Sequence, residues 1–230
     1  MKTIFAVTLL SVLACGDTFA QVRGAPQGTV APETFPLDQK MRSFEITNAT
    51  FPHTVAELSR GSLGRLHLGI EQIIGERRSD PTAQGVRFSL RLEDKTVRET
   101  LDTLCALDSR YAWTTDGASI NIYPRATVSD STYLFNLQIE RITLTDATDP
   151  YAALGALLRL HPEQQIGYAQ IGGDPSYAEP WTVTFEHLTV RQLINRVAEH
   201  MGPQSSWTWR GIKGERMFAF FKGGYHAPDQ

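Results

Sequence analysis

The chain has 230 residues, of which 41% are hydrophobic and 20% charged, and its formal net charge is -3. This composition is typical of a globular protein that is long enough to bury one or two hydrophobic cores. So slight an acidity argues against nucleic acid or an anionic membrane surface as the main partner, because both attract basic patches.

The first twenty residues have the pattern of a secretory signal peptide. Lys2 supplies a positive start, and residues 4–14 form an apolar run that is too short to span a bilayer. Small residues at 18 and 20, on either side of Phe19, suit cleavage before Gln21. The sequence VLAC ending at Cys15 instead resembles a bacterial lipobox, which would leave Cys15 lipidated. Both alternatives predict an exported protein, either periplasmic or secreted, or anchored to the outer membrane as a lipoprotein.

The segments at the two ends of the mature chain lack sustained periodicity. Residues 21–43 are spaced with proline and glycine and predict a flexible linker, and residues 223–230 predict a disordered tail. Cys15 is removed or acylated on both readings, so Cys105 is left as a single thiol and no disulfide framework is expected.

Four helix starts are predicted between these ends. Thr54, Thr96 and Thr189 each precede an acid or amide by three residues, which is the capping-box pattern, and Thr148-Asp149-Pro150 places a proline at a helix start. Apolar residues then recur with helical spacing in two places, at Val97, Leu101, Leu104 and Cys105 and at Val190, Leu193, Ile194, Val197 and Met201.

Alternating apolar residues on both sides of these helices predict strands. One set surrounds the Thr96 helix at residues 86–92, 111–113 and 120–123, with a hairpin turn at Asp116-Gly117, and a similar set surrounds the Thr189 helix. Aligning the two Thr-Val-Arg motifs predicts an internal duplication with a period of about 93 residues. We therefore expect an α+β protein of two similar βαβ-βαββ modules, residues 44–125 and 132–222, with short helices packed on small mixed sheets.

Residues 86–125 resemble the short N-terminal domain of secretins and TonB-dependent receptors. The family pattern of a strand, a T-V-x-E-x-L-D-x-L helix and a closing hairpin ending in I-x-I-x-P occurs here at residues 89–92, 96–104 and 120–124. The resemblance implies a periplasmic, non-catalytic module that docks onto protein partners in secretion or outer-membrane transport assemblies. No secretin or barrel domain follows in this chain, so the partner is left open.

No catalytic or cofactor motif stands out. The six histidines lack metal-ligand spacing, and no nucleophile elbow, Walker loop or dinucleotide fingerprint occurs, so we expect no metal and no cofactor. Glu186-His187 matches Glu93-Asp94 in the first unit, which favours a turn between strand and helix over an acid–base pair. Cys105 lies on an apolar stripe and is interpreted as a small hydrophobic residue.

Aromatic residues are the remaining candidates for binding a partner. Tyr111 with Trp113, and Trp207 with Trp209, are spaced two apart and so share a strand face, and Trp181 lies nearby in the second unit. They either pack in the cores or form an aromatic docking surface. We expect a non-enzymatic module that binds an envelope protein through edge strands or these aromatics, with no nucleic acid and no membrane contact beyond a lipid anchor. The alternative is an exported hydrolase whose site assembles only in three dimensions.

Overall fold

The computed structural model describes residues 36–61, 66–73, 85–164, 166–168, 176–212 and 215–222. All of them belong to one compact unit, Thr34–Gln230. The predicted signal peptide with Cys15, linker residues 21–35 and the tail at 223–230 lie outside the described residues. No helix in the described ranges has the length and apolarity needed to cross a bilayer.

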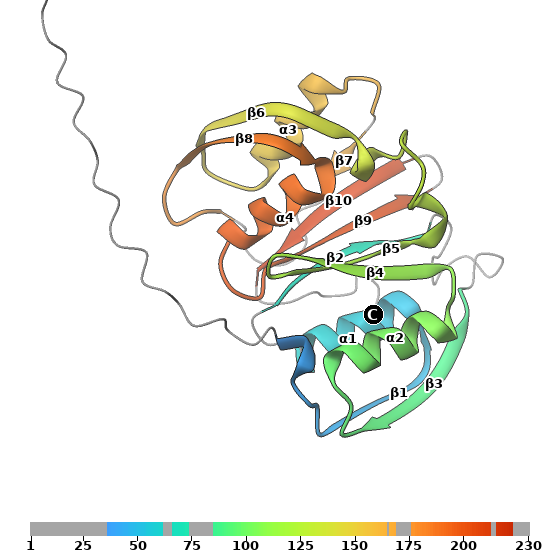
Figure 1. Ribbon diagram of the computed structural model, residues 1–230. Coiled ribbons are helices and arrows are strands. Elements are labelled where there is room, and N and C mark those ends of the chain that lie inside the picture. The colour runs from blue at the N-terminus through green and yellow to red at the C-terminus, as the bar shows by residue number, and fades with distance from the viewer. Residues whose placement is uncertain are drawn as a thin grey trace, which may run out of the picture. The chain divides into compact units, whose positions relative to one another are not determined.

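The described chain is α+β, as predicted, with four α-helices and ten strands (Figure 1). The first half contains β1 (Ser43–Thr50), α1 (Phe51–Gly61), β2 (His67–Glu71), β3 (Arg87–Glu93), α2 (Val97–Leu107), β4 (Tyr111–Asp116) and β5 (Ser119–Pro124). The second half contains β6 (Gln138–Ala147), α3 (Tyr151–Leu160), β7 (Gly167–Tyr168), β8 (Trp181–Thr189), α4 (Val190–His200), β9 (Ser206–Ile212) and β10 (Glu215–Phe221). Short 3₁₀ helices precede each half and join them, at η1 (Pro36–Asp38), η2 (Arg125–Thr127) and η3 (Leu134–Asn136).

Strands and helices follow each other in the same order in the two halves, and local backbone details also correspond. A bulge lies late in both β1 and β6, where Asn48 and Asp146 have positive φ and donate their amide N–H to Ser89 and Thr182 hydroxyls. Small polar residues tolerate such left-handed backbone better than most side chains. Asp94 and His187 likewise share a positive φ, of 54° and 53°, just before the helices α2 and α4.

A six-stranded sheet with the order β4-β5-β2-β9-β10-β7 runs through both halves. Each half contributes three neighbouring strands, an antiparallel hairpin and one strand parallel to it. The halves join where β2 pairs in parallel with β9, from Leu68 opposite Ser206 to Glu71 opposite Trp209. Backbone hydrogen bonds therefore cross the junction, which we call the seam.

The helices lie between this sheet and two outer ribbons. Ribbon β1–β3 covers α1 and α2, and ribbon β6–β8 covers α3 and α4 (Figure 1). Leu68 and Ile70 of β2 lie in the core of the first half. Trp207 and Trp209 of β9 lie in the core of the second half, and their partners in the strand pairing are Gly69 and Glu71 of β2. Because side chains alternate along a strand, the two pairs of helices cover opposite faces of the sheet.

Two of the three predicted capping boxes are confirmed. Thr96 and Thr189 each accept from the backbone N–H three residues on, while Glu99 and Gln192 bond back to the cap backbone. The prediction for Thr54 is wrong, because α1 begins at Phe51 and the Thr54 hydroxyl donates to the Thr50 carbonyl one turn earlier. A β-strand that runs directly into the helix leaves no extended residue at Thr54 to act as a cap.

The predicted flexible linker ends earlier than expected. Residues 36–43 are ordered against the first half: Leu37 and Met41 are buried in its core, and the Met41 amide donates to the Lys95 carbonyl at 2.8 Å. The expectation of a linker is therefore wrong for this stretch. Prolines and glycines are spaced through residues 21–36, but in the stretch that follows two apolar residues, Leu37 and Met41, lie four apart and reach the core.

Candidate functional site

Three of the five predicted binding aromatics lie inside the cores. Tyr111 is fully buried and stacks on Phe51 with ring centroids 4.2 Å apart, and Trp207 and Trp209 pack around Phe135. The interpretation of these three as a docking surface is wrong. Their strands face the helices of their own half, and large apolar rings are buried there because that removes the most surface from water.

Trp113 and Trp181 are only half-buried. Trp113 of β4 donates its indole N–H to Asp102 at 2.9 Å, and the guanidinium of Arg98 lies 5.8 Å from its ring. Trp181 of β8 stacks on the exposed ring of His200 at 3.8 Å and touches Tyr177 and Phe185 edge-on. A contact role for these two stays a prediction.

The residues considered for chemistry occupy structural positions. His187 and Glu186 lie near the end of β8, where exposed His187 is 3.4 Å from Glu140 of the neighbouring strand. Cys105 is buried on the apolar face of α2, and burial raises the pKa of its thiol to about 12, so little thiolate forms. Within the described ranges, no group of three His, Cys, Asp or Glu could hold a metal ion.

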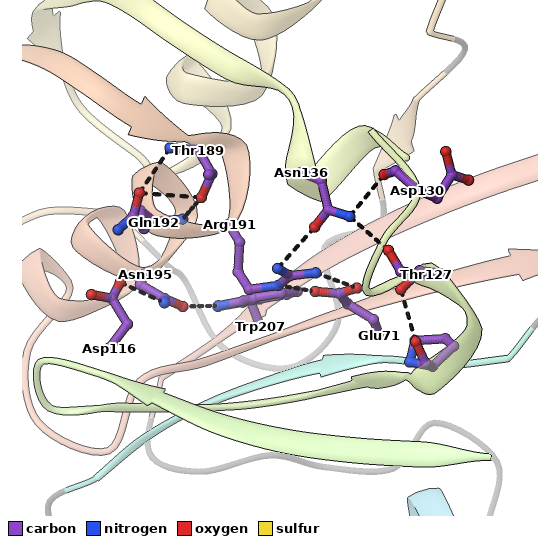
Figure 2. Close-up of polar contacts among 11 residues, drawn as sticks. Glu71, Asp116, Thr127, Asp130, Asn136, Thr189, Arg191, Gln192, Asn195 and Trp207 are labelled. Atoms are coloured by element: carbon purple, nitrogen blue, oxygen red, sulfur yellow. Dashed lines mark hydrogen bonds and ion pairs between the residues drawn. The ribbon is translucent and has the colours of Figure 1, made fainter. Parts of the chain in front are cut away.

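A cluster of polar contacts lies along the seam (Figure 2). Glu71, at the end of β2, has a side chain with 0% exposure, and it accepts from Arg191 of α4 at 2.6 Å and 3.1 Å. The two residues come from different halves of the chain. Such a two-pronged contact is the strongest geometry for this pair of groups.

Arg191 also binds the segment that joins the two halves. Its third nitrogen donates to the Asn136 side chain at 3.1 Å, and the Asn136 amide donates in turn to the Thr127 and Asp130 carbonyls (Figure 2). The guanidinium lies 4.8 Å from the ring centre of Tyr123 on β5. One arginine thus connects β2, β5 and the linking segment, and the first turn of α4 is held over the first half.

A tight contact of another kind lies two residues before Glu71 on β2. A Cβ added to Gly69 of β2 would overlap the indole of Trp207, so the ring occupies the space that a side chain would need. The Trp207 indole N–H donates to buried Asn195 of α4 at 3.0 Å, and Asn195 donates to Asp116 of the β4–β5 hairpin. Glycine at residue 69 is therefore what allows Trp207 to pack across the seam.

The far end of α4 makes a second set of charged contacts with the same hairpin. Arg196 contacts Asp116 at 3.3 Å and Glu199 at 2.9 Å, and the Ser119 hydroxyl donates to Glu199. These groups are partly exposed, so each contact contributes about 1 kcal/mol or less. Together with Arg191 they fasten both ends of α4 to the first half.

Burial changes the protonation of two groups at the seam. It raises the pKa of Glu71, while the hydrogen bonds from Arg191 act against that rise. Burial lowers the pKa of His67, whose Nδ1 lies 3.1 Å from the Ser205 carbonyl of the other half. That contact fits a neutral imidazole that donates from Nδ1. The seam is thus built for a neutral histidine and a paired carboxylate.

The outer edge of β4 occupies a position in its hairpin similar to that of the β9 edge at the seam. Trp113 lies three residues before the end of β4 and pairs with Ile122 of β5. Trp209 lies three residues before the end of β9 and pairs with Phe218 of β10. Both strands follow a helix that begins with Thr-Val-Arg. β9 is paired with β2, whereas no strand among the described residues pairs with the outer edge of β4.

Sequence reasoning identified neither the seam nor the role of Arg191. Glu71 ends β2 and Arg191 belongs to a repeated motif, but 120 residues separate them. The available signal was the glutamate at the end of an otherwise apolar strand, since a carboxylate there needs a cationic partner.

Comparison with known proteins adds no relative: no family model, curated protein or solved structure matches this chain.

Proposed function

We propose that the protein is an exported, non-enzymatic module of the cell envelope that binds a partner protein by accepting a strand at the outer edge of β4. One observation carries the proposal: the same type of edge, in β9, already binds a strand within this chain. An extended segment added to a sheet edge gains main-chain hydrogen bonds, and pockets beside the edge select its side chains.

Several features that usually protect edge strands are missing from the described β4 edge. Its sequence, Tyr-Ala-Trp-Thr-Thr-Asp, contains no lysine and no proline, and its pairing with β5 has no bulge. Natural sheets discourage added strands with these residues, with bulges, or by covering the edge. At its first residue the edge is occupied, because the Tyr111 carbonyl accepts from Arg125 at 3.2 Å and its N–H donates to Asp108. From Trp113 to Asp116 no described strand pairs with it, and this open part beside a half-buried tryptophan supports a binding role.

The wider proposal follows the sequence. The start of the chain supports export, to the periplasm or outside the cell, or to the outer membrane if Cys15 is lipidated. The resemblance of residues 86–125 to the short N-terminal domain of secretins and TonB-dependent receptors supports the same setting. The common element order of the two halves and their paired positive-φ residues support an internal duplication. Secretion or outer-membrane transport assemblies are accordingly the expected setting.

Photo-crosslinking from the edge tests this function. A benzophenone amino acid replaces exposed Thr115 of β4 in intact cells, and the same amino acid at exposed Arg141 of β6 is the control. We expect a discrete protein adduct from residue 115 that is absent from residue 141. Identical adducts from both positions, or none from residue 115, would overturn a binding role for this edge.

A further inference from the structure

The seam shows in atomic detail how a module of this chain holds an added strand. β2 runs parallel to β9, and the Gln72 amide donates to the Trp209 carbonyl at 2.8 Å. Glu71, the residue opposite Trp209, extends its carboxylate to Arg191 at the start of the following half's helix. The bound strand is thus recognised by its backbone and by one acidic side chain.

The same parts surround the outer edge of β4, which no described strand pairs with from Trp113 to Asp116. Arg98 is the third residue of the Thr96-Val97-Arg98 motif, as Arg191 is of the later one, and its guanidinium lies 5.8 Å from the Trp113 ring. In antiparallel pairs the main-chain groups of successive residues point alternately toward and away from the partner strand. The Trp209 carbonyl points away from β10, toward β2, where it accepts from Gln72. Trp113 has the same place in the β4–β5 hairpin as Trp209 has in the β9–β10 hairpin, so its carbonyl points away from β5.

Arg98 contacts an acidic residue that does not lie on a neighbouring strand. Asp38 of η1 accepts from the Arg98 Nε at 3.2 Å, and the two side chains are 67% and 49% exposed. An ion pair so exposed to water contributes little to stability. Arg98 is therefore held near the edge by a carboxylate that another carboxylate can replace at small cost.

We infer that the β4 edge accepts an extended segment of a partner protein that runs parallel to β4 and places an aspartate or glutamate opposite Trp113, where it binds Arg98. The inference rests on the proposed function and specifies its ligand. Asp38 holds the position in the absence of the segment. Backbone pairing provides the attachment, and the carboxylate selects the register.

A peptide with the sequence of residues 66–72, LHLGIEQ, is the probe, because β2 is the strand already held in this way. Its binding to the full chain is compared by fluorescence anisotropy with that of the peptide that carries glutamine in place of glutamate. We expect the acidic peptide to bind about three- to tenfold more tightly, the range of a partly desolvated charge pair.

Variants of the protein identify the groups that bind the probe. Arg98→Ala is expected to make the two peptides equal, while Lys95→Ala, which removes a neighbouring cation that contacts Glu99, preserves the difference. Asp38→Asn frees Arg98 and is expected to tighten binding of the acidic peptide about twofold or more. These three positions are exposed, so the fold is expected to persist, and circular dichroism checks that it does.

A fourth variant separates the β4 edge from strand exchange at β9. By the alternation above, Thr115 directs its N–H outward, so Thr115→Pro removes a donor from the edge and leaves the ladder to β5 intact. Thr115→Ala is its matched control. Binding lost in the proline variant and kept in the alanine variant supports the inference, and equal binding by both assigns the peptide to β9 and overturns it.

The result is distinguishable from failure of the proposed function. If the residue 115 crosslink forms but both peptides bind equally, the edge binds a partner and the acidic recognition is wrong. Absence of peptide binding up to its solubility limit also overturns the inference, whatever the crosslink shows.

Discussion

Arg191 and Glu71 form a two-pronged ion pair across the seam, while Arg98, in the Thr-Val-Arg motif of the first half, forms a surface pair with Asp38. The two arginines occur in the same Thr-Val-Arg motif. The two pairs contribute differently to the free energy of unfolding. Arg191 is only 17% exposed and lies beside a carboxylate with 0% exposure, so loss of either partner would leave a buried charge without its counter-ion.

Loss of the buried arginine is expected to destabilise the fold strongly. Arg191→Met leaves the Glu71 carboxylate buried without its cation and should reduce the free energy of unfolding by about 3 kcal/mol or more. The matched change Arg98→Met should cost less than about 1 kcal/mol. Urea unfolding of the two variants measures both, and equal losses would contradict the difference in burial.

The double variant tests the cause of that loss. Glu71→Gln combined with Arg191→Met removes both charges, so it is expected to be more stable than Arg191→Met alone, by about 1 kcal/mol or more. A double variant that is less stable than the single one would show that the methionine itself, rather than the unpaired carboxylate, causes the damage.

Gly69 is expected to tolerate no larger residue. In Gly69→Ala the new methyl group overlaps the Trp207 indole, which is itself held by Asn195, so the free energy of unfolding should fall by about 1–3 kcal/mol. Gly155→Ala in α3 is the control, since its nearest neighbour is a flexible arginine end at 3.8 Å. That helix position should gain about 0.5–1 kcal/mol. Thermal unfolding that ranks the two variants in the opposite order would contradict the packing.

Stability is expected to fall in mild acid through His67. Its pKa is lowered by burial in the folded state, so between that value and the ordinary value of 6.5 the unfolded chain binds more protons. The contribution of His67 is complete above pH 6.5 and is lost as the pH falls through this window. His67→Asn, whose amide can replace the Nδ1 donor, should flatten the pH dependence measured by urea unfolding. Replacement of exposed His187 by asparagine is the control, and equal flattening by both would contradict the assignment.

Cys105 is expected to react slowly with thiol reagents in the folded protein. Burial both blocks access and raises the pKa of the thiol to about 12, so a disulfide reagent at pH 8 should react about a hundredfold more slowly than with the urea-unfolded chain. The Cys15→Ser variant isolates the signal from this thiol. Similar rates in the folded and unfolded states would place Cys105 at the surface.

Capping motifs and apolar periodicity in the sequence predicted most of the helices and strands that depend on residues close together in the chain. The caps at Thr96 and Thr189 and the apolar stripes of α2 and α4 appear in the structure, and the hairpin turn predicted at Asp116-Gly117 lies one residue later, at residues 117–118. These features depend on residues within a few positions of one another. Thr54 was predicted wrongly for the same reason, because the motif carries no information about the strand that runs directly into α1.

The sequence by itself determined the α+β class, the repeated helix starts and the alternation that turns large side chains toward a core. Only the tertiary structure decided which aromatics are exposed, and it showed that β2 pairs with β9 and that Arg191 meets Glu71. The physical reason is distance along the chain: capping and periodicity act between neighbours, whereas pairing of sheet edges and ion pairing join residues more than a hundred positions apart.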